Sequence, residues 1–119
     1  MMHKLTDMAV KVHTARLLAY HTGWLIDNGW PATANAAMAK VYAADICKAV
    51  CLDGMQVMGG AGYVRESNMQ RYLREAVLNT IVGGTNETQR NTIGMALELG
   101  LPRQTRERQA DQAEKRLRA

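Results

Sequence analysis

The sequence of 119 residues contains few prolines, which break helices, and few aromatic residues, which favour sheets. It has no Phe and only two prolines, Pro31 and Pro102, whereas Ala, Leu, Met and Arg are abundant, and this composition favours helices over sheets. No run of about 18 apolar residues occurs, so we expect no membrane span. The first residues lack a long apolar core and an Ala-x-Ala cleavage site. We therefore expect a cytoplasmic protein without a secretory signal.

Charge and potential metal ligands are also limited. The net charge is +4, but residues 101–119 hold six Lys/Arg against three Asp/Glu, so the preceding 100 residues carry only +1. A basic tail without aromatic residues does not predict a nucleic-acid-binding surface. The two cysteines, Cys47 and Cys51, lie four apart in a helical pattern, and the three histidines show no zinc spacing. We expect two buried thiols and no metal site.

Apolar residues recur at helical spacing through most of the chain and predict an all-α fold. We expect an up-down bundle of three to four helices over about residues 4–28, 33–58, 67–79 and 86–99. Gly29, Gly59 and Gly100 stand where the first, second and last of these helices are expected to end. The prediction is one helical domain over 1–102, completed by association of copies, and a charged tail over 103–119.

Side chains that can cap a helix precede three of these segments. They are Thr33 or Asn35, then Ser67, and finally Thr85 or Asn86. The last pair follows Gly83 and Gly84, so a glycine-rich loop enters a helix N-terminus. Local chemistry alone favours an ordinary capped loop there, with an anion-binding site as the alternative. The Gly59–Gly62 stretch follows no strand, which excludes a dinucleotide-binding fingerprint.

Five segments, in order, resemble the C-terminal helical domain of the acyl-CoA dehydrogenases, and the resemblance covers nearly all of residues 1–100. They are HKLTDMA at 3–9, AMAKVYA at 37–43, QVMGGAGY at 56–63, RYLREA at 71–76 and IVGGTNETQR at 81–90. The resemblance implies dehydrogenation of acyl-CoA thioesters between Cα and Cβ, with FAD as the hydride acceptor and a glutamate as the base. It also implies an N-terminal helical domain, a middle β-domain, tetramers, and electron transfer to an electron-transferring flavoprotein.

The same resemblance assigns binding residues in two segments. Contacts to the FAD of a neighbouring subunit are implied for Gln56, Val57, Met58, Gly59 and Gly60. Contacts to FAD near the last helix are implied for Thr85, Asn86 and Glu87. Gly84 is expected beside the acyl-CoA.

Two departures from the family pattern weigh against catalysis by this chain alone. The usual position of the catalytic glutamate, just before Gly84, is occupied by Gly83. The first helix of the domain, where some members place the base, and the middle domain are not in the sequence. Glu66 and Glu87 are carboxylates at helix starts, where caps and solvated charges are common. We predict no catalytic residue here and an inactive chain in isolation; a non-enzymatic oligomerisation module is the alternative.

Overall fold

The structure, a computed structural model, describes residues 1–99 and consists of helices joined by short connections. The helices are α1 (Met2–Asp27), α2 (Thr33–Met58), α3 (Gly60–Tyr63), α4 (Asn68–Leu78) and α5 (Asn86–Ala96). The prediction of an all-α fold is confirmed for this part of the chain, and none of these helices is long and apolar enough to cross a membrane. The predicted tail over 103–119 lies outside the described residues.

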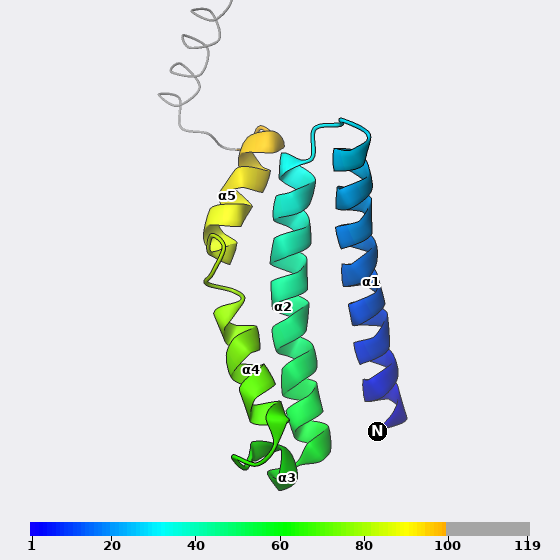
Figure 1. The fold of residues 1–119 in the computed structure, drawn as a ribbon, viewed down its shortest axis with the longest axis vertical. Coiled ribbons are helices and arrows are strands. Elements are labelled where there is room, and N and C mark those ends of the chain that lie inside the picture. The colour runs from blue at the N-terminus through cyan, green and yellow to red at the C-terminus, as the bar shows by residue number, and fades with distance from the viewer. Residues whose placement is uncertain (100–119) are drawn as a thin grey trace, which may run out of the picture.

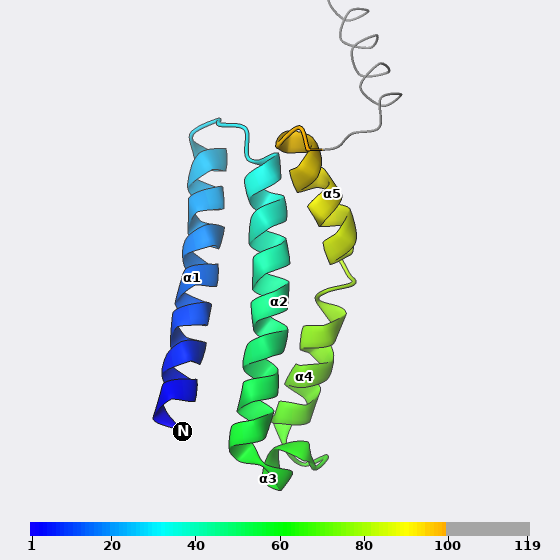
Figure 2. The same cartoon turned by 180° about the vertical axis from the view of Figure 1, so that it is seen from behind.

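The long helices form three columns in one layer (Figures 1 and 2). Helix α2 is the middle column, α1 runs antiparallel along one side, and α4 and α5 follow one another along the other side. Only α2 packs against both outer columns: within residues 1–99, the backbone of α1 does not come close to that of α4 or α5. The up-down order matches the prediction, but one layer cannot enclose a core as a closed bundle does.

Most helix boundaries follow from local chemistry that the sequence already displayed. Helix α1 ends in a Schellman motif, in which Gly29 has φ +71° and the N–H of Trp30 donates to Leu25 O at 2.9 Å. The hydroxyl of Ser67 accepts from the Met69 N–H at 3.2 Å, and the hydroxyl of Thr85 accepts from the Thr88 N–H at 3.2 Å. The predicted stop at Gly29 and the caps at Ser67 and Thr85 are confirmed.

Two local predictions were wrong, and one short helix after the correctly predicted stop at Gly59 was not predicted. The N-cap of α2 is Ala32, and neither Thr33 nor Asn35 caps the helix. The glycines after α2 allow the single helical turn α3, where only a break was expected, because Gly59 turns the chain at φ +59° and Gly60–Tyr63 resumes helical geometry. Helix α5 ends at Ala96 rather than near 99, because Glu98 adopts φ +56° and closes a Schellman-type end.

The interior contains small residues only. The buried apolar residues are Ala37, Ala44 and Ala76, and no large side chain among the described residues is fully buried. Alanines let α2 approach its neighbours closely, but they bury little apolar area and so give limited hydrophobic stabilisation. Leu97 is exposed, as are four apolar residues that recur at helical spacing along α1: Leu5, Val12, Ala19 and Ile26.

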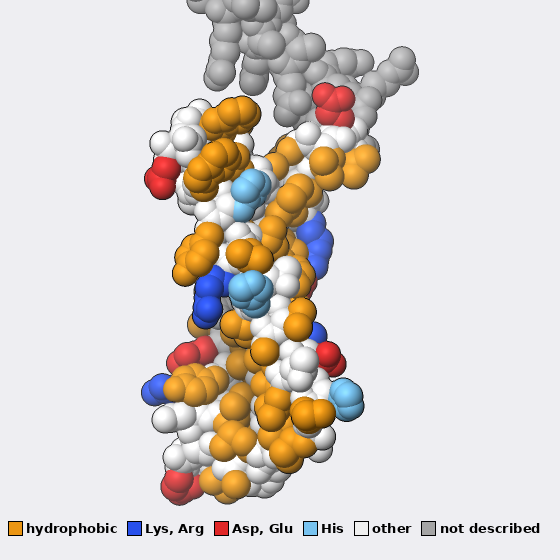
Figure 3. Space-filling view, turned by 90° about the vertical axis from the view of Figure 1, so that its right-hand side faces the viewer, with side chains coloured by type: hydrophobic (Ala, Val, Ile, Leu, Met, Phe, Trp, Pro, Cys, Tyr) orange, Lys and Arg blue, Asp and Glu red, His pale blue; other side chains and the backbone are white. Residues whose placement is uncertain are grey.

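One face of α2 forms the floor of an open groove. Three hollows lie along it, and their floor residues recur every three or four positions: Ala36, Lys40, Ala43, Cys47, Val50 and Gly54. Helix α1 lines one side of the groove, and α4, α5 and their connection line the other. Exposed apolar side chains also gather on the face shown in Figure 3. Val10, Leu17 and Trp24 are all exposed, and their spacing of seven positions puts them on one side of α1, away from Met8 and Lys11. Helix α1 therefore carries apolar residues on opposite sides, which is typical of a covered helix.

Candidate functional site

The connection between α4 and α5 brings two exposed glycines to the surface halfway along α2 (Figure 1). Gly83 and Gly84 have φ +67° and +82°, a region that residues with a Cβ rarely adopt. Nothing lies within 4 Å of the position that a Cβ on Gly83 would occupy, so its backbone is open to approach. The Asn86 N–H donates to Thr80 O at 3.0 Å and closes the loop behind the glycines. The loop therefore exposes its glycine backbone to solvent, and the hydrogen bond to Thr80 anchors it.

Helix α5 begins directly after these glycines, with an acid in its first turn. Thr85 is the N-cap, and Glu87 follows it on the surface. The backbone N–H of Glu87 itself and the Thr85 hydroxyl lower the pKa of the Glu87 carboxyl, in accord with the field at a helix N-terminus. A carboxylate held ionised in this way is a weak proton acceptor, so the geometry does not favour Glu87 as a base.

Asn86 differs from its neighbours because its side chain is turned toward α2 and is only 2% exposed. Its Nδ2 donates to Asp45 Oδ1 at 2.9 Å, and its Oδ1 accepts from Lys40 Nζ at 2.8 Å. Arg90, one turn further along α5, donates to the other oxygen of Asp45 at 2.7 Å. These four residues, Lys40, Asp45, Asn86 and Arg90, are the Asn86 cluster, and they join the start of α5 to the middle of α2.

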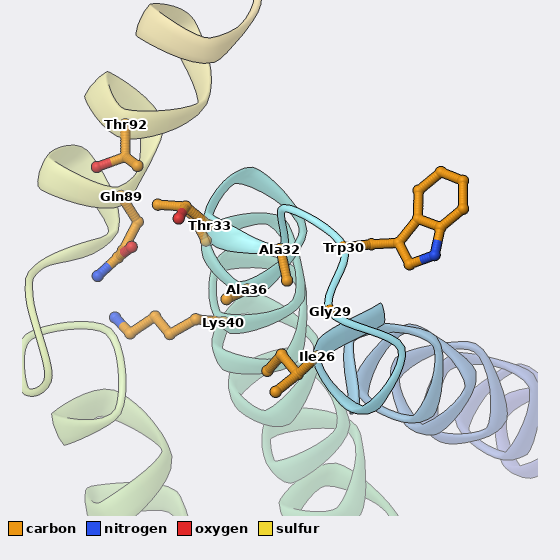
Figure 4. A pocket seen from close by; sticks show the side chains of 10 residues that line it. Ile26, Gly29, Trp30, Ala32, Thr33, Ala36, Lys40, Gln89 and Thr92 are labelled. Carbon is orange, nitrogen blue, oxygen red and sulfur yellow. The ribbon is translucent and has the colours of Figure 1, made fainter. Parts of the chain in front are cut away.

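The back of the glycine loop borders the groove. Gln89 Nε2 donates to Gly83 O at 3.0 Å, and a Cβ added to Gly84 would meet that same nitrogen at 2.6 Å. Gly83 also lines a hollow of about 430 Å³ above Ala43 and Cys47. Lys40 and Gln89, whose side chains point toward one another in Figure 4, line a neighbouring hollow of about 770 Å³. The loop therefore has one side toward solvent and one toward the groove.

The second predicted binding segment, Gln56–Gly60, lies at the far end of α2, beside α3. Gln56, Met58, Gly59 and Gly60 are exposed, and Val57 is half-buried. Nothing within 4 Å blocks the Cβ positions of the two glycines, so a flat or anionic group can approach this backbone. The length of α4, about 16 Å for eleven residues, separates this segment from the Gly83 loop (Figure 1). The chain does not join the two segments into one pocket.

The cysteines form no metal site with neighbouring residues. Cys47 and Cys51 are free and half-buried, and partial burial together with the adjacent Cys47 raises the pKa of the Cys51 thiol. Within residues 1–99, no group of three or more His, Cys, Asp or Glu side chains is placed to hold a metal ion. The thiols are less buried than the sequence predicted.

With this geometry established, comparison with known proteins identifies the family. The sequence pattern of the family "acyl-CoA dehydrogenase, C-terminal domain" matches residues 1–98. The chain belongs to the acyl-CoA dehydrogenase family. The resemblance predicted from the five sequence segments is thereby confirmed.

Individual relatives agree with this assignment. The chain is 41% identical over 95 residues to the caffeyl-CoA reductase–Etf complex subunit CarC of Acetobacterium woodii, covering 79% of this chain and 25% of CarC. It is 44% identical over 87 residues to the mitochondrial short-chain specific acyl-CoA dehydrogenase of Bos taurus, covering 73% and 21%. The solved FAD complex of PigA superimposes with a TM-score of 0.79 at 31% identity, covering 82% and 26%. The chain thus spans about a quarter of the length of these proteins.

Sequence reasoning missed Lys40 and Asp45 as parts of the site. A signal was present: both are charged residues inside an Ala-rich helix, where a charge that faces a neighbouring helix needs a partner. Their partner, Asn86, lies more than forty positions further along the chain. Only the packing of α5 against α2 makes the connection visible.

Proposed function

We propose that this chain is the C-terminal helical part of an acyl-CoA dehydrogenase-type flavoenzyme that oxidises acyl-CoA thioesters between Cα and Cβ. The observation that carries the proposal is the loop Gly83–Glu87, where open glycine backbone leads into a capped helix N-terminus on the surface. Such backbone suits close approach by a flavin or a thioester. FAD, when bound, supplies the hydride acceptor.

This chain's own residues contribute binding surfaces to that chemistry. Thr85 and Glu87 present a capped helix start to FAD, Gly84 lies where the acyl-CoA passes, and Gln56–Gly60 meets the FAD of another subunit. The open Cβ positions at Gly59, Gly60 and Gly83 support this fit. An electron-transferring flavoprotein is the proposed electron acceptor, which the naming of CarC as a subunit of an Etf complex supports.

Catalysis requires more than this chain contains. Gly83 occupies the usual position of the base, and the lowered pKa of Glu87 makes that carboxylate a poor substitute. We expect no turnover when the purified chain is mixed with FAD, butyryl-CoA and an artificial electron acceptor. Measurable acyl-CoA oxidation by the chain alone would show that it contains a base after all.

The open groove supports a second candidate, a helical oligomerisation module without catalysis. A single helix layer with exposed apolar residues along both sides of α1 favours association, either with the remaining domains of the enzyme or with another copy. Light scattering of the purified chain at micromolar concentration tests this: the module predicts dimers or larger species, and a clean monomer contradicts it. A flavin absorption spectrum in the purified protein instead favours the enzyme.

A further inference from the structure

We propose that Asn86 is a positioning residue that fixes the Gly83–Glu87 loop on α2 and does not itself touch the flavin. The inference rests on the proposed function for the role of the loop, but the positioning is argued from the geometry of this chain alone. The Asn86 side chain is buried, and its two polar atoms already bind Lys40 and Asp45. Its backbone N–H is bound to Thr80 O.

The chemistry of the Asn86 cluster requires a carboxamide at this position. Lys40 can only donate and an ionised Asp45 can only accept, so a side chain between them needs one acceptor and one donor end. Asn provides both in a short side chain. An aspartate would bring a second carboxylate against Asp45, and an alanine would leave Lys40 and one oxygen of Asp45 without this partner. Arg90 secures the other oxygen of Asp45 and holds its orientation.

Because of its position, the cluster determines where the Gly83–Glu87 loop lies. Asn86 is the first residue of α5, directly after the cap Thr85 and two residues after Gly84. Displacing Asn86 therefore displaces the N-terminus of α5, the Thr85 hydroxyl and both glycines together. Among the described residues, no side chain of α4 or α1 hydrogen-bonds to the cluster, so its side-chain contacts tie the start of α5 to α2.

A reciprocal exchange tests this in the full chain. Asn86→Asp puts two carboxylates together, and we expect amide hydrogen exchange in segment 79–88 to become at least about tenfold faster. In the double variant Asn86→Asp with Asp45→Asn, the carboxylate at position 86 accepts from Lys40 and from the amide at position 45. Its hydrogen exchange is therefore expected to return near the original rate. Asn91→Ala, an exposed asparagine on the same helix, is the matched control and leaves the rate unchanged.

The outcomes separate the positioning from the proposed function. An Asn86→Asp chain with unchanged exchange in 79–88, or a double variant no slower than Asn86→Asp, overturns the positioning role. If the unmodified chain quenches FAD fluorescence on binding, its affinity is expected to follow the same order, with Asn86→Asp at least about tenfold weaker and the double variant restored. Equal FAD affinity of all three chains contradicts control of the flavin-facing loop. Absence of FAD binding by the unmodified chain counts against the proposed function, while hydrogen exchange still decides the positioning.

Discussion

Two aspartates on α2 hold the two outer columns, and they do so differently. Asp45 binds Asn86 and Arg90 of α5, whereas Asp53 binds Lys4 at 2.6 Å and Lys11 at 3.7 Å, both on α1. The α5 contact includes a buried amide whose partners have to match it, and the α1 contact consists of partly exposed ion pairs. Surface ion pairs contribute little and tolerate rearrangement, so the start of α5 depends on a matched buried amide, whereas the ion pairs of α1 demand no such match.

The largest expected effect comes from removing the buried amide. Asn86→Ala leaves Lys40 and Asp45 short of a hydrogen-bond partner at the α2–α5 contact, so we expect the free energy of unfolding to fall by about 2 kcal/mol. Urea denaturation followed by circular dichroism measures this. Asn91→Ala, which changes the same residue type on the exposed side of α5, is expected to stay within about 0.5 kcal/mol of the original chain. If both variants lost the same free energy of unfolding, the buried Asn86–Asp45 contact would be no stronger than a surface contact such as that of Asp53.

A smaller effect is expected from the glycines of the two connections. Gly84→Ala combines a left-handed φ of +82° with a Cβ 2.6 Å from Gln89 Nε2, so the side chain of Gln89 has to move away from Gly83 O. We expect a loss of about 2 kcal/mol at most. Gly29→Ala in the α1–α2 turn has a similar φ but no atom near its Cβ, so about 1 kcal/mol is expected. If Gly29→Ala lowered the free energy of unfolding more than Gly84→Ala, the α4–α5 connection would not be more tightly constrained than the α1–α2 turn.

The smallest effect concerns Asp53 and depends on pH. The hydrogen bond from Lys4 holds the pKa of the Asp53 carboxyl below its ordinary value, so the unfolded chain binds this proton more readily than the folded one. The stabilisation is therefore present above pH about 4 and disappears as the pH falls through the folded-state pKa. Asp53→Asn is expected to lower the urea midpoint slightly at pH 7 and to match the original chain at pH about 2. A difference in urea midpoint of the same size at both pH values would show that ionisation of Asp53 contributes nothing to stability.

The helix boundaries were largely predictable because their causes are local. Ser67, Thr85 and Gly29 cap or end helices through atoms within a few residues of themselves, and the sequence displays them directly. The end of α5 was misplaced because Glu98 takes a left-handed conformation that its residue type does not indicate. The single turn α3 was missed for a related reason: a four-residue helix leaves no periodicity to detect.

The site was predictable only in part. The glycine loop and its cap could be located from residues 83–87, because turn chemistry and family resemblance coincide there. The inward orientation of Asn86 could not be predicted, since it depends on Lys40 and Asp45, which lie 46 and 41 residues earlier in the chain. Asn86 remains a predicted member of the flavin-binding segment, but its side chain supports the loop from behind.

The central claim is that the Gly83–Glu87 loop and the Gln56–Gly60 segment form flavin-facing surfaces of an acyl-CoA dehydrogenase-type enzyme. The most direct test replaces the matching C-terminal segment of the Bos taurus short-chain enzyme with residues 1–99 of this chain and measures bound FAD per subunit, with the unaltered enzyme as reference. We predict a folded chimera that retains FAD at the reference ratio. A chimera with the same helical content and assembly as the reference but without bound FAD would contradict the account.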